Sequence, residues 1–181
     1  MQIQKTTTDD ELAIRQVHEA AFGPEEGPAI ADLVASLLED PGASPMISLL
    51  ACAESAPIGH VLITRVRISE PDSPAFAHIL APLAVIPEHQ GQGVGSQLVR
   101  RGLTDLSESE CELVFVLGHP GYYPRFGFQP AGCLGFSAPH PIPEENSDAW
   151  MVLELRQGTI GNLSGTVQCA DALNAPQHWR E

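Results

Sequence analysis

Apolar residues recur over the first forty positions at the spacing of amphipathic helices. Two such stretches meet at Phe22-Gly23-Pro24, a combination that favours a break. Thr8 and Glu11 have the spacing of a capping box at the start of the first stretch. The second stretch ends at Asp40-Pro41-Gly42, and its stripe consists of Ile30, Leu33, Val34, Leu37 and Leu38. The sequence therefore predicts two helices before residue 42.

The pattern then changes to that of strands. Residues 48–53 and 59–68 are strand-like, and the turn-prone Ser55-Ala56-Pro57 joins them. Residues 76–86 are almost wholly apolar, which is typical of a central strand covered on both faces. Pro87 ends this run, because proline cannot donate to a sheet ladder.

A third helix is predicted after the glycines at 91–95, with an apolar stripe of Val94, Leu98, Leu103 and Leu106. Residues 112–117 and 151–155 are predicted strands. The Pro- and Gly-rich segment 130–146 is expected to be an irregular crossing. No linker divides the chain. We therefore expect a single domain over residues 1–181, of mixed α/β class, with a central mixed β-sheet flanked by helices.

Composition excludes some classes of function. Acidic residues outnumber basic ones 23 to 9, for a net charge of −14. Nucleic-acid binding is disfavoured, because neutralising phosphates requires clustered Lys and Arg. The negative field would attract a cationic amine, although acidity that only keeps the chain in solution explains it equally well.

The apolar runs bear on the cellular location of the protein, and the spacing of the cysteines bears on the redox state of their thiols. No apolar run approaches the roughly 20 residues that span a bilayer, and the first ten residues carry no apolar signal region. We expect a cytoplasmic protein with no membrane partner. The four cysteines have no Cys-x-x-Cys spacing and are expected to be buried reduced thiols: Cys52, Cys111, Cys133 and Cys169.

Residues 85–96 carry the most informative chemistry, because glycines there join an apolar strand to a helix. Glycines let a backbone approach a ligand closely, and the unpaired amides at a helix start attract anions. A Walker A loop is excluded, because it requires a lysine and none is present here. The dinucleotide fingerprint does not match either, because it requires a glycine at position 96, where this chain has Ser96. The pattern Gln/Arg-x-x-Gly-x-Gly/Ala matches at Gln90-Gly91-Gln92-Gly93-Val94-Gly95. Taken alone, these six residues equally fit a tight turn without a ligand.

This match resembles motif A of the GNAT superfamily of acetyl-CoA-dependent N-acetyltransferases. Upstream, Leu83-Ala84-Val85-Ile86-Pro87 is similar to the strand of that family. Downstream, Tyr122-Tyr123-Pro124-Arg125-Phe126-Gly127-Phe128 is similar to its aromatic element. Leu117-Gly118-His119-Pro120 and residues 158–168 resemble the YhbS-like branch. The resemblance covers nearly the whole chain and implies a GNAT-like acyl-CoA N-acyltransferase fold.

The resemblance also implies acetyl-CoA as the co-substrate, with no metal. The backbone of Leu83 and Val85 would pair with the pantetheine arm, and the Leu83 amide would be the oxyanion contact to the thioester carbonyl. Gln90 would add a side-chain donor, and the amides that follow would hold the diphosphate. The implied cofactor-binding residues are Leu83, Ala84, Val85, Gln90, Gly91, Gln92, Gly93, Val94, Gly95 and Ser96.

By the same resemblance, Tyr123 is the general acid that donates a proton to the departing sulfur. A half-buried tyrosine whose hydroxyl is bonded locally is the structural alternative. Tyr122 is interpreted as a packing residue.

The general base departs from the family pattern. Relatives often carry Glu or His at the positions of Ile79 and Ala81, which are apolar here. His78 should face the opposite side, because side chains alternate along a strand. His119 is a tentative base, with a loop histidine near the pantetheine as an equal alternative. The remaining alternatives are deprotonation through water, or by Glu25 and Glu26, which correspond to the acceptor rim of relatives but also fit a solvated helix start.

Two functions follow. The first is an N-acetyltransferase that moves an acetyl group directly from acetyl-CoA to a primary amine of a small molecule or peptide, within a ternary complex. The second is a non-catalytic acyl-CoA-binding sensor or interaction module. The apolar Ile79 and Ala81 favour the second, whereas Tyr123 favours the first. The acceptor and the oligomeric state, including a homodimer, stay open.

Overall fold

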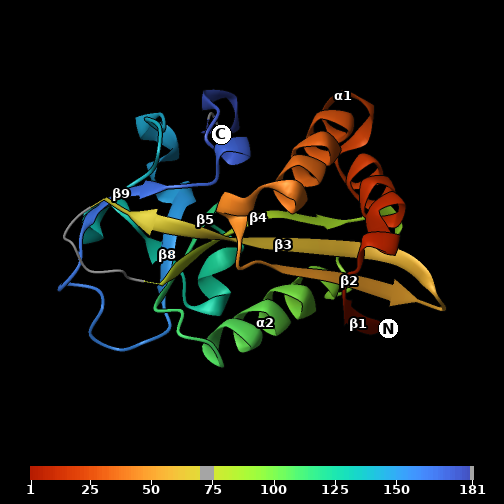
Figure 1. The fold of residues 1–181 in the computed structure, drawn as a ribbon, viewed down its shortest axis with the longest axis horizontal. Helices are drawn as coiled ribbons and strands as arrows, with labels where there is room; N and C mark the ends of the chain where they lie inside the picture. Colours follow the sequence, from red (N-terminus) through yellow and green to blue (C-terminus); the bar gives the residue numbers. More distant parts are fainter. Residues whose placement is uncertain (70–75, 180–181) are drawn as a thin grey trace.

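A mixed β-sheet lies between two helices in the computed structural model, which describes residues 1–69 and 76–179. Helix α1 (Glu11–Glu39) covers one face of the sheet and α2 (Val94–Ser107) the other (Figure 1). Within the described residues, the main strand order is β1-β2-β3-β4-β5-β8-β6, and β9 pairs with β3 and β7. The bounds are β1 Gln2–Lys5, β2 Ile47–Ala53, β3 Ala56–Ile68, β4 Ala77–Val85, β5 Leu113–Leu117, β6 Gln129–Pro130, β7 Phe136–Ser137, β8 Trp150–Glu154 and β9 Gly165–Gln168.

The strand pairing confirms the predicted mixed sheet. Strands β1 to β4 are antiparallel neighbours, β4 and β5 are parallel, and β5 and β8 are antiparallel. The apolar run predicted to be central is β4, which pairs with β3 on one side and β5 on the other. Four strands were not predicted. In β1 only Ile3 is partly buried, and β6, β7 and β9 are too short for a periodic pattern. That the whole chain forms one domain stays a prediction.

The break predicted in the first helical region is confirmed. Gly23 has φ 74° and ψ −177°, so α1 consists of two helical halves joined at this residue. The predicted capping box is wrong by one residue. The Thr7 amide, instead of the pair Thr8 and Glu11, donates to the Asp10 carboxylate at 2.8 Å. A 3-10 turn, Thr8–Asp10, precedes α1 and moves the start of the helix.

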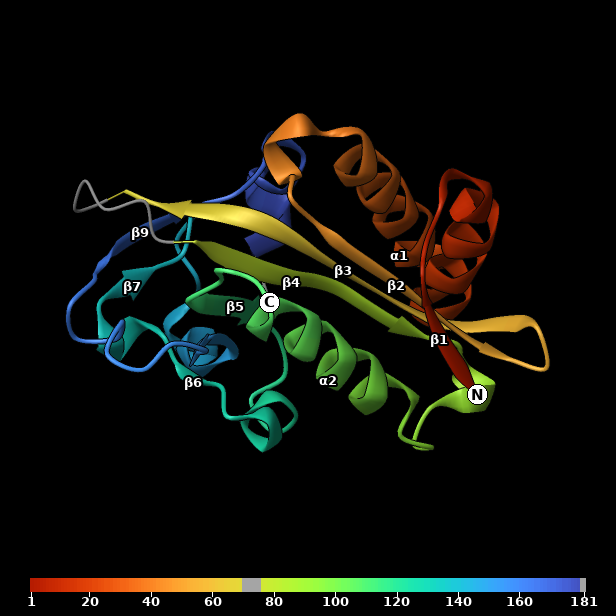
Figure 2. The ribbon, with the colours of Figure 1, turned by 60° about the horizontal axis from the view of Figure 1, so that its bottom comes forward.

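Each face of the sheet has its own hydrophobic core. One core fills the space beneath α1 and extends to the C-terminal segment, where Phe115, Trp150 and Trp179 stack or meet edge to face. The other lies beneath α2, which packs along β2, β3 and β4 (Figure 2). Among the described residues, no helix has the length and apolar character to cross a membrane.

The four cysteine thiols are free, as predicted, but they are not all buried. Cys111 is buried, Cys52 and Cys169 are partly buried, and Cys133 is exposed. Cys133 follows the short strand β6 on the irregular crossing, where its Sγ contacts the Pro130 carbonyl. Burial raises the pKa values of Cys111 and Cys169 to about 12, so both thiols are protonated at neutral pH.

Two fully buried histidines join α1 to the sheet. His18 Nε2 and His60 Nδ1 are 2.9 Å apart, and His60 Nε2 lies 2.9 Å from the Ser48 hydroxyl. Thr6 donates to Ser48 at 2.6 Å, which extends the chain of polar groups to the residue after β1. Burial lowers the pKa of His18 to about 4, and burial together with the neighbouring His18 lowers that of His60. Both rings are therefore neutral at pH 7.

We predict that this pair makes the fold acid-sensitive. Because the native pKa values lie below the unfolded value near 6.5, the unfolded state binds more protons at acidic pH, and stability falls as pH decreases from 6.5 towards 4. The expected loss is about 2 kcal/mol for a fully shifted histidine between pH 6.5 and 5. The measurement is the denaturant midpoint across this range, with NMR titration of the two rings. Ring titration near pH 6.5 in the native protein would contradict the prediction.

Candidate active site

Strand β4 loses its β5 partner after the first three of its nine residues. The two strands are paired only at Ala77↔Leu113, His78↔Val114 and Ile79↔Phe115, although β4 continues to Val85. At the same point, the register against β3 shifts. Val61 faces Leu83 while Ile63 faces Leu80, so β4 contains an extra residue here. Such a bulge bends a strand and increases its twist. Within the described chain, the β4 edge beyond the bulge is not paired with another strand.

The backbone groups of Leu83 and Val85 point to this free edge. The Ile86 amide donates to the Ile58 carbonyl of β3 at 3.0 Å. In an antiparallel ladder these bonds fall on alternate residues, so Leu83 and Val85 direct their N–H and C=O groups away from β3. The Val85 carbonyl instead accepts a bond from the Gln90 side-chain amide at 3.0 Å. An extended ligand could pair with this edge as an added strand.

The start of α2 lies beside the same edge. Gly91 and Gly93 have φ values of 70° and 84°, and a Cβ on either would meet open space. Gly93 is the N-cap, and the first amides of α2 have no intrahelical acceptor. A Cβ on Gly95 would lie 3.5 and 3.6 Å from methyl carbons of Val85 and Leu83. The loop and the strand edge are therefore adjacent, as an anion site next to an extended ligand requires.

A cleft of about 1090 Å³ opens between α1, the β4 edge and the segment after β5. Its lining brings together Leu83, His119 and Tyr123 with Glu25 and Glu26. The predicted phosphate-loop residues 90–96 are not among its lining residues. They adjoin it through Tyr122, which lines the cleft while its hydroxyl lies 3.5 Å from Ser96 Oγ.

Tyr123 is held by close packing. Its side chain is 8% exposed, and its ring meets those of Tyr122 and Phe128 edge to face. A Cβ on Gly118 would lie 2.4 Å from the Tyr123 ring, so only glycine fits there without a shift. Tyr122 packs against the core beneath α2, its hydroxyl lies 3.5 Å from Ser96 Oγ, and the Arg125 guanidinium lies over its ring at 4.6 Å.

The histidines near β4 and β5 have different surroundings. His78 is buried, with Nδ1 3.3 Å from Cys111 Sγ and Nε2 3.1 Å from the Pro45 carbonyl, so it points away from the cleft as strand alternation predicted. His119 is exposed and lines the cleft, and its Nδ1 accepts the Gly121 amide at 3.0 Å. A neutral imidazole has one acceptor nitrogen, so this bond leaves the proton on Nε2.

No sequence pattern predicts the C-terminal wall of the cleft. Asn146, Leu173, Gln177, His178 and Trp179 line it from irregular segments and 3-10 turns. Such segments have no periodicity that would place them in space. Burial lowers the pKa of His178, so its ring is neutral at pH 7.

Both the sequence and the fold are similar to those of known proteins. The family model of the acetyltransferase (GNAT) domain matches residues 2–131. The uncharacterized N-acetyltransferase YjhQ of Escherichia coli K12 is 51% identical over 168 residues, 92% of this chain and 90% of that protein. The uncharacterized N-acetyltransferase YhbS of the same strain is 32% identical over 149 residues, 82% of this chain and 86% of that protein.

Solved structures share the fold. The crystal structure of E. coli YhbS in complex with CoA has a TM-score of 0.84 at 28% identity, covering 96% of this chain and 92% of that one. A GNAT family acetyltransferase from Brucella melitensis in complex with acetyl-CoA has a TM-score of 0.75 at 28% identity, covering 95% and 97%. With the matching family model, these similarities show that the chain belongs to the GNAT family of acetyltransferases.

Proposed function

We propose that the protein transfers an acetyl group from acetyl-CoA directly to the primary amine of an acceptor within a ternary complex. The observation that carries this proposal is the free edge of β4, which adjoins both the start of α2 and the cleft that contains Tyr123. The CoA and acetyl-CoA complexes of YhbS and the Brucella protein support the choice of co-substrate. We expect the protein to act in the cytoplasm on small-molecule or peptide amines.

The residues around the free edge fit acetyl-CoA, which would supply an acetyl group activated as a thioester. The backbone of Leu83 to Val85 would pair with the pantetheine arm, and the amides from Gly91 to Ser96 would hold the diphosphate. The open space around Gly91 and Gly93 leaves room for this approach. Gln90 would exchange its bond to Val85 for one to the co-substrate.

Tyr123 and Leu83 have complementary roles in this proposal. The Leu83 amide, at the free edge, would donate to the thioester carbonyl and stabilise negative charge there. The Tyr123 hydroxyl would give its proton to the leaving sulfur. Both residues line the same cleft, and packing against Gly118 limits the positions open to the Tyr123 ring.

The proton of the acceptor ammonium must also be removed. His119 lines the cleft and is our candidate base, but its Nδ1 already accepts the Gly121 amide. To take a proton, His119 must first release this bond. Glu25 and Glu26 line the same cleft and are the alternative proton acceptors, directly or through water.

We predict that Tyr123→Phe lowers kcat by about 10²-fold or more, because it removes the proton donor. Binding of acetyl-CoA should stay nearly intact, since the ring remains. Thiol release with an acceptor amine measures the first effect and calorimetric titration with acetyl-CoA the second. Unchanged turnover would refute the general-acid role. Acetyl-CoA binding by the wild-type protein, with no thiol release for any amine, would instead support the non-catalytic sensor.

We predict that Gly93→Ala raises the Kd for acetyl-CoA about tenfold, because a positive φ disfavours any residue with a Cβ and the loop amides would move. Gly158→Ala is a matched control. Gly158 has φ 95° and open space around it, but it is not part of the loop. Both variants should lose about 1 kcal/mol of stability, and only Gly93→Ala should bind acetyl-CoA more weakly. Equal affinities for the two variants would contradict the assignment of the loop.

We predict that His119→Ala lowers kcat/KM about 10²-fold at the pH optimum, if His119 removes the ammonium proton. The acidic limb of the pH profile should disappear or move, and the KM for acetyl-CoA should not change. The measurement is kcat/KM for the amine as a function of pH, for the variant and the wild-type protein. An unchanged profile would exclude His119 and leave the carboxylates or water.

A further inference from the structure

The walls of the cleft on the acceptor side are mainly apolar. The α1 wall presents Phe22, Ala29, Ile30 and Leu33, and the opposite wall presents Leu117, Leu173 and Trp179. The Phe22 ring stacks on the His18 ring, with 6.1 Å between the ring centroids. His18 in turn contacts His60 of β3, which holds this wall against the sheet. Apolar walls of this kind favour an apolar body, and the same lining also contains the polar side chains of His119, Asn146, Gln177 and His178.

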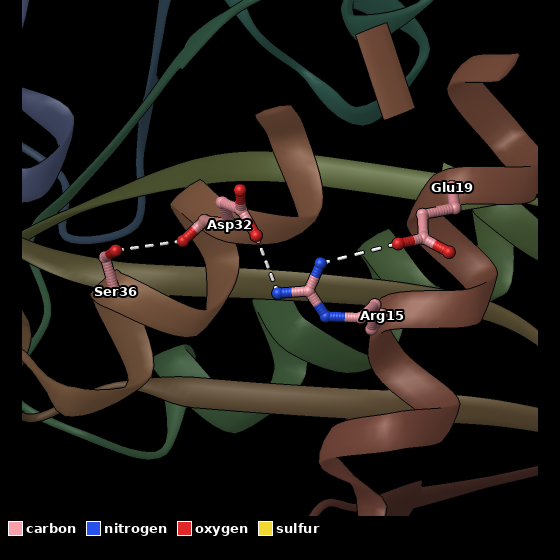
Figure 3. Close-up of polar contacts among 4 residues, drawn as sticks. All are labelled: Arg15, Glu19, Asp32 and Ser36. Carbon is pink, nitrogen blue, oxygen red and sulfur yellow. Dashed lines mark hydrogen bonds and ion pairs between the residues drawn. The ribbon is translucent and has the colours of Figure 1, made fainter. Parts of the chain in front are cut away.

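The fixed charges on the lining are negative. Glu25 and Glu26 line the cleft from the second half of α1 and are exposed. Among the described residues, no Lys or Arg lines it. Arg15 is the basic residue of α1, and it is already paired with Asp32 at 2.6 Å and Glu19 at 3.4 Å (Figure 3). The two carboxylates of the cleft therefore have no neighbouring cation on their own helix.

These surroundings discriminate between acceptors. An ammonium would approach two carboxylates and be attracted by them. A carboxylate or phosphate on the acceptor would be repelled by the same two charges, and the lining, among the described residues, offers it no Lys or Arg as a counter-ion. An apolar body without an anionic group would satisfy both the walls and the charges.

We propose that the acceptor is a primary amine on an alkyl or arylalkyl body that carries no carboxylate or phosphate. This inference rests on the proposed acetyl transfer and specifies its substrate class. Free amino acids are poor acceptors under this proposal, and the amines that their decarboxylation yields are good ones. Glu25 and Glu26 act as specificity residues that favour the cationic, non-anionic acceptor.

The test compares matched pairs of acceptors with the full-length protein and acetyl-CoA. The pairs are pentylamine and norleucine, 2-phenylethylamine and phenylalanine, and tryptamine and tryptophan, which differ only by a carboxylate. We expect kcat/KM to be at least about tenfold higher for the amine in every pair that is used. Equal or better use of the amino acids would overturn the acceptor class and leave the proposed acetyl transfer intact. Acetylation of none of the six would overturn the acceptor class. If the protein also fails to bind acetyl-CoA, the proposed function itself is overturned.

The double variant Glu25→Gln/Glu26→Gln tests the origin of the discrimination. In this variant, the ratio of kcat/KM for the amine to kcat/KM for the matching amino acid should fall roughly threefold or more, as expected for exposed charges. The KM for acetyl-CoA should not change. The matched control is Glu11→Gln/Glu39→Gln, which removes the same charge from the exposed ends of α1, outside the cleft. A general loss of folding would lower both rates of a pair and leave their ratio unchanged. An unchanged ratio in the first variant, or an equal change in both variants, would overturn the role of Glu25 and Glu26.

Discussion

The separation of β4 from β5 creates the open strand edge on which the proposed binding of acetyl-CoA depends. Parallel strands normally satisfy each other's backbone groups along their whole length, but here the pairing ends after Ile79 and Phe115. The extra residue in β4 bends the strand at this point. The backbone groups of Leu83 and Val85 are then left at an open edge, beside the start of α2. An edge of this kind attracts an extended chain, and in the proposed function that chain is the pantetheine arm.

The two regions on either side of this edge favour ligand groups of opposite charge. On one side, the amides at the start of α2 favour anions, as the diphosphate of a CoA requires. On the other side, Glu25 and Glu26 and the apolar walls favour a cation with an apolar body. Tyr122 lies between the two regions, with its hydroxyl near Ser96 and its ring next to that of Tyr123. The loop before α2 and the adjoining cleft therefore offer opposite electrostatic conditions to the two proposed substrates.

Much of the fold could be predicted from local patterns. The break at Gly23, the central strand β4 and the helix after the glycines follow from periodicity and from residues that stop an element. Strand β1 could not be predicted, because an edge strand with one partly buried apolar residue has no alternating pattern. The capping box was misplaced by one residue because Thr7 and Thr8 are both suitable caps, and the contact to Asp10 decides between them.

For the site, sequence motifs predicted three features: the glycine loop, the strand Leu83-Ala84-Val85 and Tyr123. These motifs follow one another along the chain in the same order as in a known family. The conformation of a glycine and the start of a helix are also local properties, so a short stretch of sequence can predict them. The surfaces that meet across the cleft, by contrast, follow from the packing of the whole chain. This packing placed Glu25 and Glu26 opposite the C-terminal wall with Trp179, and it engaged His119 with Gly121. Glu25 and Glu26 lie more than a hundred positions from Trp179 in the sequence, and their presence on one cleft depends on packing that no local pattern encodes.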